Sequence, residues 1–172
     1  MAIREIVSVP DAVLRRKARK VTEFDKDLQK LIDDMVETMR EAPGVGLAAP
    51  QVGISQQLIV VEFSESDDEE DEEAPKKLFA LANPEIVKVS EETVTGVEGC
   101  LSIPGLVGEV DRPVQVYIRA QNRRGQPVKI KAQGWLARIF QHEIDHLEGV
   151  LFTDRATRVW KPSKDEEAAY LD

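Results

Sequence analysis

The stretch from Gly134 to Gly149, GWLARIFQHEIDHLEG, constrains the fold most, because it combines a helical pattern with a possible metal site. Its apolar residues recur at the spacing of a helix, and a glycine stands at each end. His142 and His146 are four positions apart, so on a helix they project from the same face and can bind one metal ion. We expect this helix to pack against a sheet through its apolar residues and to carry a metal site.

The rest of the chain indicates one α+β domain. Its 172 residues are enough for a single domain with a core, and 42% hydrophobic and 32% charged residues are typical of a soluble globular protein. The pattern predicts an amphipathic helix over 25–41, strands over 57–63 and 78–84, and a hairpin over 114–132. The second strand is expected to end at Asn83 and Pro84. We expect antiparallel or mixed sheets packed around the central metal-binding helix, with a long N-terminal amphipathic helix.

Composition also limits the possible partners and location. No apolar run approaches the roughly 20 residues that span a bilayer, and no secretory signal is visible, so we expect a cytoplasmic protein without a membrane partner. The formal net charge is −9, but eight acidic residues lie between Glu65 and Glu73, and without them the charge is about −1. We interpret this acidic segment as a solvated loop rather than a docking site for a basic partner. Lys and Arg form no stripe, so we predict no direct nucleic-acid binding.

Two histidines leave a catalytic metal without its usual third protein ligand. The peptidase pattern HExxHxxGxxH would need a histidine where this chain has Phe152, and two glutamates near the chain end are a poor substitute. The single cysteine, Cys100, stands in GVEGCLSIPG, where glycines allow close backbone approach, and a thiolate binds borderline-soft divalent metals well. We expect Cys100, His142 and His146 to bind the ion and to leave a position open for water. The alternative for Cys100 is a small buried hydrophobic residue.

An ion at this position would lower the pKa of bound water from 15.7 toward about 7 and make hydroxide available at neutral pH. Glu143, next to His142, can take the proton and later deliver it to a leaving amine. Attack on an amide carbonyl creates an oxyanion, and the side-chain amide of Gln51 in GVGLAAPQVG can donate a hydrogen bond to it. That segment alone is interpreted more simply as a Gly/Pro loop after the helix.

Taken together, GVGLAAPQ, EGCLS and QHEIDH closely resemble the three motifs of the peptide deformylase family, in the same order. The resemblance runs from the N-terminal segment to GVLF at 149–152 and implies one catalytic domain of this type over 1–172. It implies hydrolytic removal of formate from the N-formylmethionine of new bacterial-type polypeptides. The expected metal is ferrous iron, and zinc, nickel or cobalt can occupy the site. The short tail gives no basis for assigning ribosome contact through a basic C-terminal helix, and the expected partners are N-formylmethionyl peptides and nascent chains, with at most transient ribosome contact.

The same resemblance assigns the metal ligands to Cys100, His142 and His146 and the general acid/base to Glu143. It assigns the two oxyanion donors to the Gln51 side chain and the Leu101 backbone N–H. Backbone groups around Val45, Gly46 and Gly99 are expected to bind an extended peptide as an added strand. The pocket for the methionine side chain is expected at four positions: Val45, Trp135, Arg138 and Ile139. Arg112 is expected to pair with Glu98.

Two other functions stay open at this stage. A zinc metallopeptidase of the HExxH type would use the same helix, cleave internal peptide bonds and not depend on Cys100. A non-catalytic metal-binding or interaction module that uses the acidic segment would show no turnover. Metal analysis and a formate-release assay separate the three functions.

Overall fold

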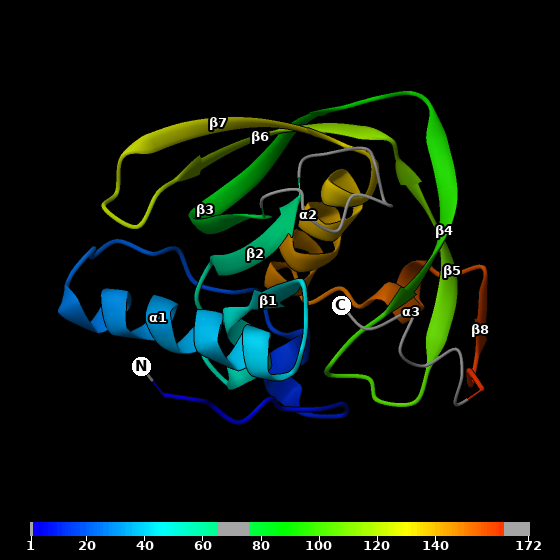
Figure 1. Ribbon diagram of the computed structural model, residues 1–172, viewed down its shortest axis with the longest axis horizontal. Helices are drawn as coiled ribbons and strands as arrows, with labels where there is room; N and C mark the ends of the chain where they lie inside the picture. The colour runs from blue at the N-terminus through cyan, green and yellow to red at the C-terminus, as the bar shows by residue number, and fades with distance from the viewer. Residues whose placement is uncertain (1, 65–75, 164–172) are drawn as a thin grey trace.

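The protein consists of two antiparallel sheets around one buried helix, in a computed structural model that describes residues 2–64 and 76–163 (Figure 1). The five-stranded sheet has the order β1-β2-β3-β6-β7, and the three-stranded sheet has the order β4-β5-β8. The first sheet contains β1 (Gly46–Ala48), β2 (Leu58–Ser64), β3 (Lys76–Val89), β6 (Gln115–Gln121) and β7 (Pro127–Gln133). The second contains β4 (Thr93–Gly99), β5 (Val107–Pro113) and β8 (Arg158–Trp160). This arrangement confirms a single α+β domain with antiparallel sheets.

The helices occupy different layers. The central helix is α2 (Gly134–Leu147), and α1 (Lys26–Glu41) covers the opposite face of the five-stranded sheet (Figure 1). The short elements are η1 (Ala12–Arg15), η2 (Ala49–Val52) and α3 (Phe152–Arg155). No helix among the described residues is long and apolar enough to cross a membrane.

Strand β2 lies between the two long helices. Ile59 and Val61 pack into the cluster around α2, whereas Leu58 and Val60 pack into the cluster around α1, and all four side chains are fully buried. A strand buried on both faces has a continuous apolar sequence instead of an alternating one, which explains the run LIVV. The strand predicted over 57–63 is therefore confirmed, and it forms the layer between α1 and α2.

Helix α1 matches its predicted bounds but not its predicted description. Asp25 caps it by accepting a hydrogen bond from the Leu28 N–H at 3.0 Å, and the helix ends at Glu41, before Pro43. A long N-terminal helix is not supported, because the helix is confined to Lys26–Glu41. The described residues before it are mostly irregular, and their only helical element is the short η1.

The prediction that a strand ends at Asn83 and Pro84 is wrong, since β3 continues to Val89. Asn83 adopts a left-handed backbone with φ of 51°, and the register with β6 shifts between Ala82 and Glu85. Proline cannot donate to a ladder, and an asparagine tolerates this conformation, so the pair forms a bulge within the strand. The bulge lets β3 pair first with β2 and then with β6.

The predicted hairpin is confirmed. Strands β6 and β7 pair in register from Gln115 opposite Gln133 to Gln121 opposite Pro127, and Gly125 in the turn has a φ of 83°. The predicted mixed pairing is limited, among the described residues, to an isolated parallel bridge between Arg19 and Gln56. The acidic segment and the two glutamates near the chain end lie outside the described residues.

The bulge yields a stability prediction. The Asn83 side chain accepts a hydrogen bond from the Val21 N–H at 2.8 Å and donates to the Val21 carbonyl and to Gln121 Oε1. Asn83→Ala removes these bonds at a left-handed position and is expected to lower the free energy of unfolding by about 3 kcal/mol. Glu85→Ala, at an exposed position two residues after Asn83, should change the free energy of unfolding by no more than about 0.5 kcal/mol. Urea unfolding measures both values, and equal stability of the two variants would contradict the role of Asn83.

Candidate metal centre

The three predicted ligands meet between α2 and the end of β4. Cys100 follows β4 directly, and His142 and His146 lie one turn apart on α2. Their ligand atoms all lie within 4.8 Å of one another, and Cys100 Sγ is 3.4 Å from His146 Nε2. The side chains are 8%, 5% and 1% exposed. Three buried donors that converge in this way form a group that can hold a metal ion.

The chemistry of these donors fits a divalent transition metal. Burial, reinforced by His142 and Arg112, holds the pKa of His146 well below its usual range, so the imidazole is neutral and has a lone pair to donate. Two imidazoles and one thiolate suit borderline ions, and three protein ligands leave one coordination position for a water molecule or substrate. The residues present therefore fit a catalytic metal.

Glu98 orients the first histidine. His142 Nδ1 donates to Glu98 Oε1 at 2.9 Å, which fixes the tautomer and leaves Nε2 as the ligand atom. Arg112 forms a bidentate ion pair with Glu98 at 2.6 and 2.8 Å, as predicted. Burial alone would raise the pKa of Glu98, but the hydrogen bonds from Arg112 and His142 outweigh it and hold the pKa far below the usual range. Glu98 is therefore an anion throughout the neutral range.

Gln51 lies beside the ligand group. Its Nε2 is 3.5 Å from Cys100 Sγ and 3.2 Å from Ser102 Oγ, and its Oε1 accepts a hydrogen bond from the Ala48 N–H at 3.0 Å. The segment GVGLAAPQVG that carries it is not an irregular loop but forms β1 and η2. Because η2 follows the edge strand directly, the Gln51 amide is placed at the ligand group by regular secondary structure.

Glu143 faces the edge strand β1 from α2. Its side chain is fully buried, and a Cβ built on Gly46 would contact its carboxylate and lie 2.9 Å from its Cδ. Glycine at position 46 therefore leaves room for the Glu143 carboxylate that any other residue would occupy. The structure therefore brings Gln51 and the three ligand residues together and places the Glu143 carboxylate, from the next residue after His142, against Gly46 of β1.

Comparison with known proteins identifies the family. The sequence matches the polypeptide deformylase family over residues 3–161. It is 54% identical to a peptide deformylase of Symbiobacterium thermophilum, over 97% of this chain and 73% of that protein. It is 47% identical to peptide deformylase 1 of Bacillus subtilis, over 93% of this chain and 94% of that protein. The crystal structure of the peptide deformylase from Thermotoga maritima superimposes with a TM-score of 0.82 at 42% identity, covering 92% of this chain and all of that one.

The chain belongs to the polypeptide deformylase family. Its relatives are named for an enzyme that hydrolytically removes N-formyl groups, so this chain is a hydrolase that removes the formyl group from new polypeptides. The match over residues 3–161 includes all three motifs on which the predicted resemblance rested.

The structure places the predicted peptide-binding residues at two strand ends. Gly46 begins β1 at one edge of the five-stranded sheet, and Gly99 ends β4 at one edge of the three-stranded sheet. Val45 precedes β1 and packs against the cluster that contains Ile139 of α2. Leu101 is partly buried and packs against the cluster under α1. Their roles toward a substrate stay predictions.

Arg138, expected in the methionine pocket, makes polar contacts that the sequence did not predict. Its guanidinium donates to Glu98 at 2.6 Å and to the carbonyls of Val94 at 2.7 Å and Val110 at 2.9 Å. The ring of Trp135, 44% exposed, lies 5.5 Å from the guanidinium carbon. In the methionine pocket expected here, Arg138 could therefore contribute only its apolar stem.

Sequence reasoning missed Asp145, which lies inside the HEIDH motif. Its carboxylate accepts hydrogen bonds from Arg112 at 2.9 Å and from Arg155 at 2.7 Å. It thereby holds Arg112 from the side opposite Glu98. Its position next to His146 was the only signal in the sequence, and a sequence does not show which arginine an acid will meet.

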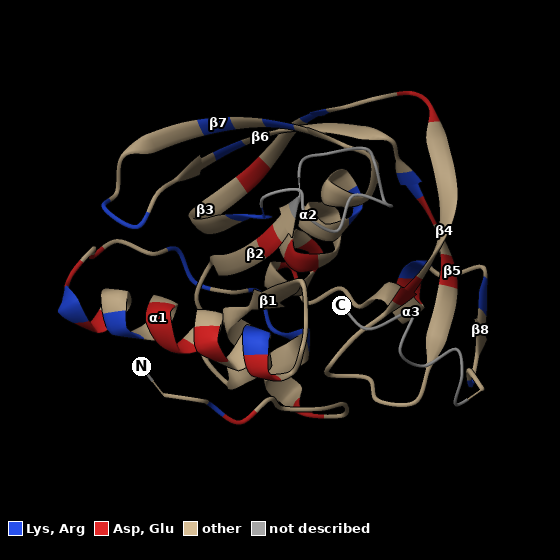
Figure 2. Cartoon of the chain, viewed as in Figure 1, with Lys and Arg blue, Asp and Glu red and all other residues tan. Residues whose placement is uncertain are grey.

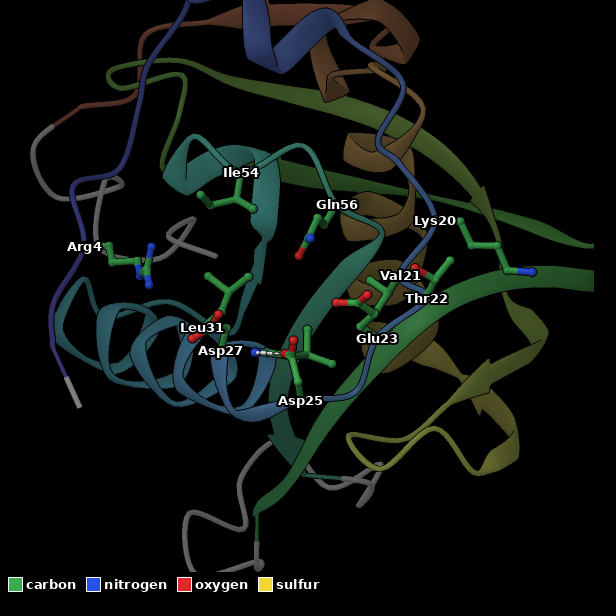
Figure 3. A pocket seen from close by; sticks show the side chains of 11 residues that line it. Arg4, Lys20, Val21, Thr22, Glu23, Asp25, Asp27, Leu31, Ile54 and Gln56 are labelled. Carbon is green, nitrogen blue, oxygen red and sulfur yellow. Dashed lines mark hydrogen bonds between the residues drawn. The ribbon is translucent and has the colours of Figure 1, made fainter.

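A pocket of about 400 Å³ lies elsewhere, at the N-terminal end of α1 (Figure 3). Charged side chains such as Lys20 and Asp27 line it together with Leu31 and Ile54. It contains none of the predicted site residues. Its volume is therefore no argument for placing the reaction there.

The ionised state of Glu98 yields a pH prediction. A carboxyl group whose pKa is lowered by folding stabilises the protein above the unfolded pKa, and this contribution is lost as the pH falls through that value toward the folded pKa. Glu98→Gln should therefore cost about 3 kcal/mol or more at pH 7 and progressively less below about pH 4.5. Urea unfolding at several pH values tests this, with the exposed Glu92→Gln as the matched control. A pH-independent difference between wild type and Glu98→Gln would contradict it.

Proposed function

We propose that residues 1–172 act as one catalytic domain that deformylates N-formylmethionyl peptides at the centre formed by Cys100, His142 and His146. The convergence of these three buried donors supports this most strongly, with Gln51 in contact with Cys100 and the buried Glu143 next to His142 on α2. In a family that hydrolyses N-formyl groups, a metal centre flanked by a carboxylate and an amide donor has the groups that amide hydrolysis needs.

When bound, a divalent ion supplies a Lewis acid for the formyl carbonyl and lowers the pKa of water. The chain's own groups do the rest. Glu143, buried against Gly46, accepts the proton of the attacking water and returns it to the leaving amine. The Gln51 amide and the Leu101 backbone N–H donate hydrogen bonds to the oxyanion.

The resident ion in this proposal is ferrous iron, with zinc, nickel or cobalt able to replace it. The His/His/Cys donor set accepts all four ions, so the donors alone do not select among them. An iron–thiolate site exposed to oxygen would be fragile, because its sulfur can be oxidised. The metal content of protein purified without oxygen tests this choice directly.

The substrate in this proposal binds as an added strand between the two sheets. Strands β1 and β4 are sheet edges. Gly99 ends β4 directly before Cys100, and Val45 and Gly46 stand at the start of β1, where Gly46 lies against Glu143. The methionine side chain enters a pocket formed by Val45, Ile139, Trp135 and the stem of Arg138. Nascent chains in the cytoplasm would be the natural substrates, with transient ribosome contact and no membrane or nucleic-acid partner.

A zinc metallopeptidase of the HExxH type is the alternative. It shares Glu143 and the two histidines but predicts cleavage of internal peptide bonds and no dependence on Cys100. The contact of 3.4 Å between Cys100 Sγ and His146 Nε2 favours the deformylase.

Two variants test the assignment of ligand and base. Cys100→Ala should remove metal-dependent release of formate from formyl-Met-Ala-Ser and lower the metal content. Glu143→Ala should retain the metal and lose activity by at least about 100-fold, because proton transfer is lost while the ligands remain. Glu148→Ala, an exposed glutamate after the same helix, is the matched control and should behave as wild type. Full deformylation by Cys100→Ala would refute the ligand assignment.

A further inference from the structure

Ser102 is a buried polar residue to which the proposed reaction gives no part. It lies two positions after Cys100 and is fully buried. Its Oγ accepts a hydrogen bond from Gln51 Nε2 at 3.2 Å, and the same nitrogen lies 3.5 Å from Cys100 Sγ. An amide nitrogen has two hydrogens. One is therefore directed at Ser102, and the other is directed at the ligand group.

The other end of the Gln51 carboxamide is also fixed. Its Oε1 accepts a hydrogen bond from the Ala48 N–H at 3.0 Å. Turning the amide over would place the oxygen against the Cys100 sulfur and the NH₂ group against another N–H donor, so favourable contacts would become unfavourable ones. Ala48 therefore fixes which end is the donor, and Ser102 fixes the direction of its two hydrogens.

The N-terminal segment holds both η2, which carries Gln51, and the turn after β4, which carries Ser102. The Val7 N–H donates to the Gln51 carbonyl at 2.8 Å, and the Val9 N–H donates to the Ser102 carbonyl at 2.9 Å. The segment is the dark blue trace at the lower edge of Figure 1. One short stretch of backbone thus sets the separation of Gln51 and Ser102, which are far apart in the sequence.

We propose that Ser102 is a positioning residue that directs one Gln51 carboxamide hydrogen toward the oxyanion formed from the formyl group. The proposal rests on the proposed function, because Gln51 has this role only if a formyl carbonyl is attacked. Ser102 touches no reacting atom and acts through Gln51. Its loss should therefore lower kcat much more than it changes KM, since the interaction strengthens as charge develops on the oxygen.

A double-mutant cycle tests this dependence. Ser102→Ala leaves a buried amide hydrogen without its acceptor and should lower kcat about tenfold, with KM within about twofold and metal content unchanged. In the Gln51→Ala background the same change should alter kcat less than about twofold, because the group through which Ser102 acts is absent. Ser90→Ala, which removes a turn hydrogen bond to the Glu92 carbonyl, is the matched control. An equal loss in both backgrounds would overturn the proposal.

A second readout does not need activity. In the zinc-loaded protein, nuclear magnetic resonance should show slow exchange with solvent for both Gln51 carboxamide hydrogens in the wild type, and faster exchange in Ser102→Ala for the hydrogen that Ser102 accepts. Equal exchange rates in the two proteins would overturn the proposal. If the wild type released no formate, the proposed function would fail, whereas this measurement would still decide whether Ser102 holds the amide.

Discussion

The buried carboxylate of Glu98 is the interaction on which the metal centre depends. It lies at the end of β4 and receives hydrogen bonds from Arg112 of β5 and from Arg138 and His142 of α2. One side chain thus connects the three-stranded sheet to the central helix and turns one imidazole toward the ion. Removing one member of such a cluster leaves buried charge without compensation, at a cost of about 3–5 kcal/mol. The Glu98 cluster therefore both stabilises the domain and fixes the geometry of its metal ligands.

The centre combines three segments that are distant in the sequence, and each is held by a different kind of structure. The histidines and Glu143 lie on α2, whose apolar side packs on the five-stranded sheet. Cys100 follows β4, and Gln51 lies in η2 directly after the edge strand β1. Charge is distributed unevenly around this frame (Figure 2). Helix α1 carries several acidic residues, whereas lysines and arginines gather on β6 and β7. The ligand residues lie inside, shielded from both surfaces.

Local sequence patterns predicted the parts of this protein whose structure depends on neighbours in the chain. The spacing of apolar residues predicted the helix that carries His142 and His146, and the run LIVV predicted a buried strand. The vacant third ligand position and thiolate chemistry predicted Cys100 as a ligand, and the motif resemblance assigned it the same role. Features that depend on distant partners could not be predicted in this way. The bulge at Asn83 lies where β3 changes from pairing with β2 to pairing with β6, and the contacts of Arg138 depend on how α2 meets β4. The three-residue strands β1 and β8 exist only because longer strands pair with them.

The central claim is that the Cys100 sulfur and two imidazoles bind the same ion. X-ray absorption spectroscopy of the zinc-loaded protein measures this most directly, because sulfur and nitrogen ligands differ in both distance and scattering. We predict one sulfur at about 2.3 Å and two imidazole nitrogens at about 2.0–2.1 Å, with one further light atom. A first coordination shell that contains only nitrogen and oxygen would contradict the claim.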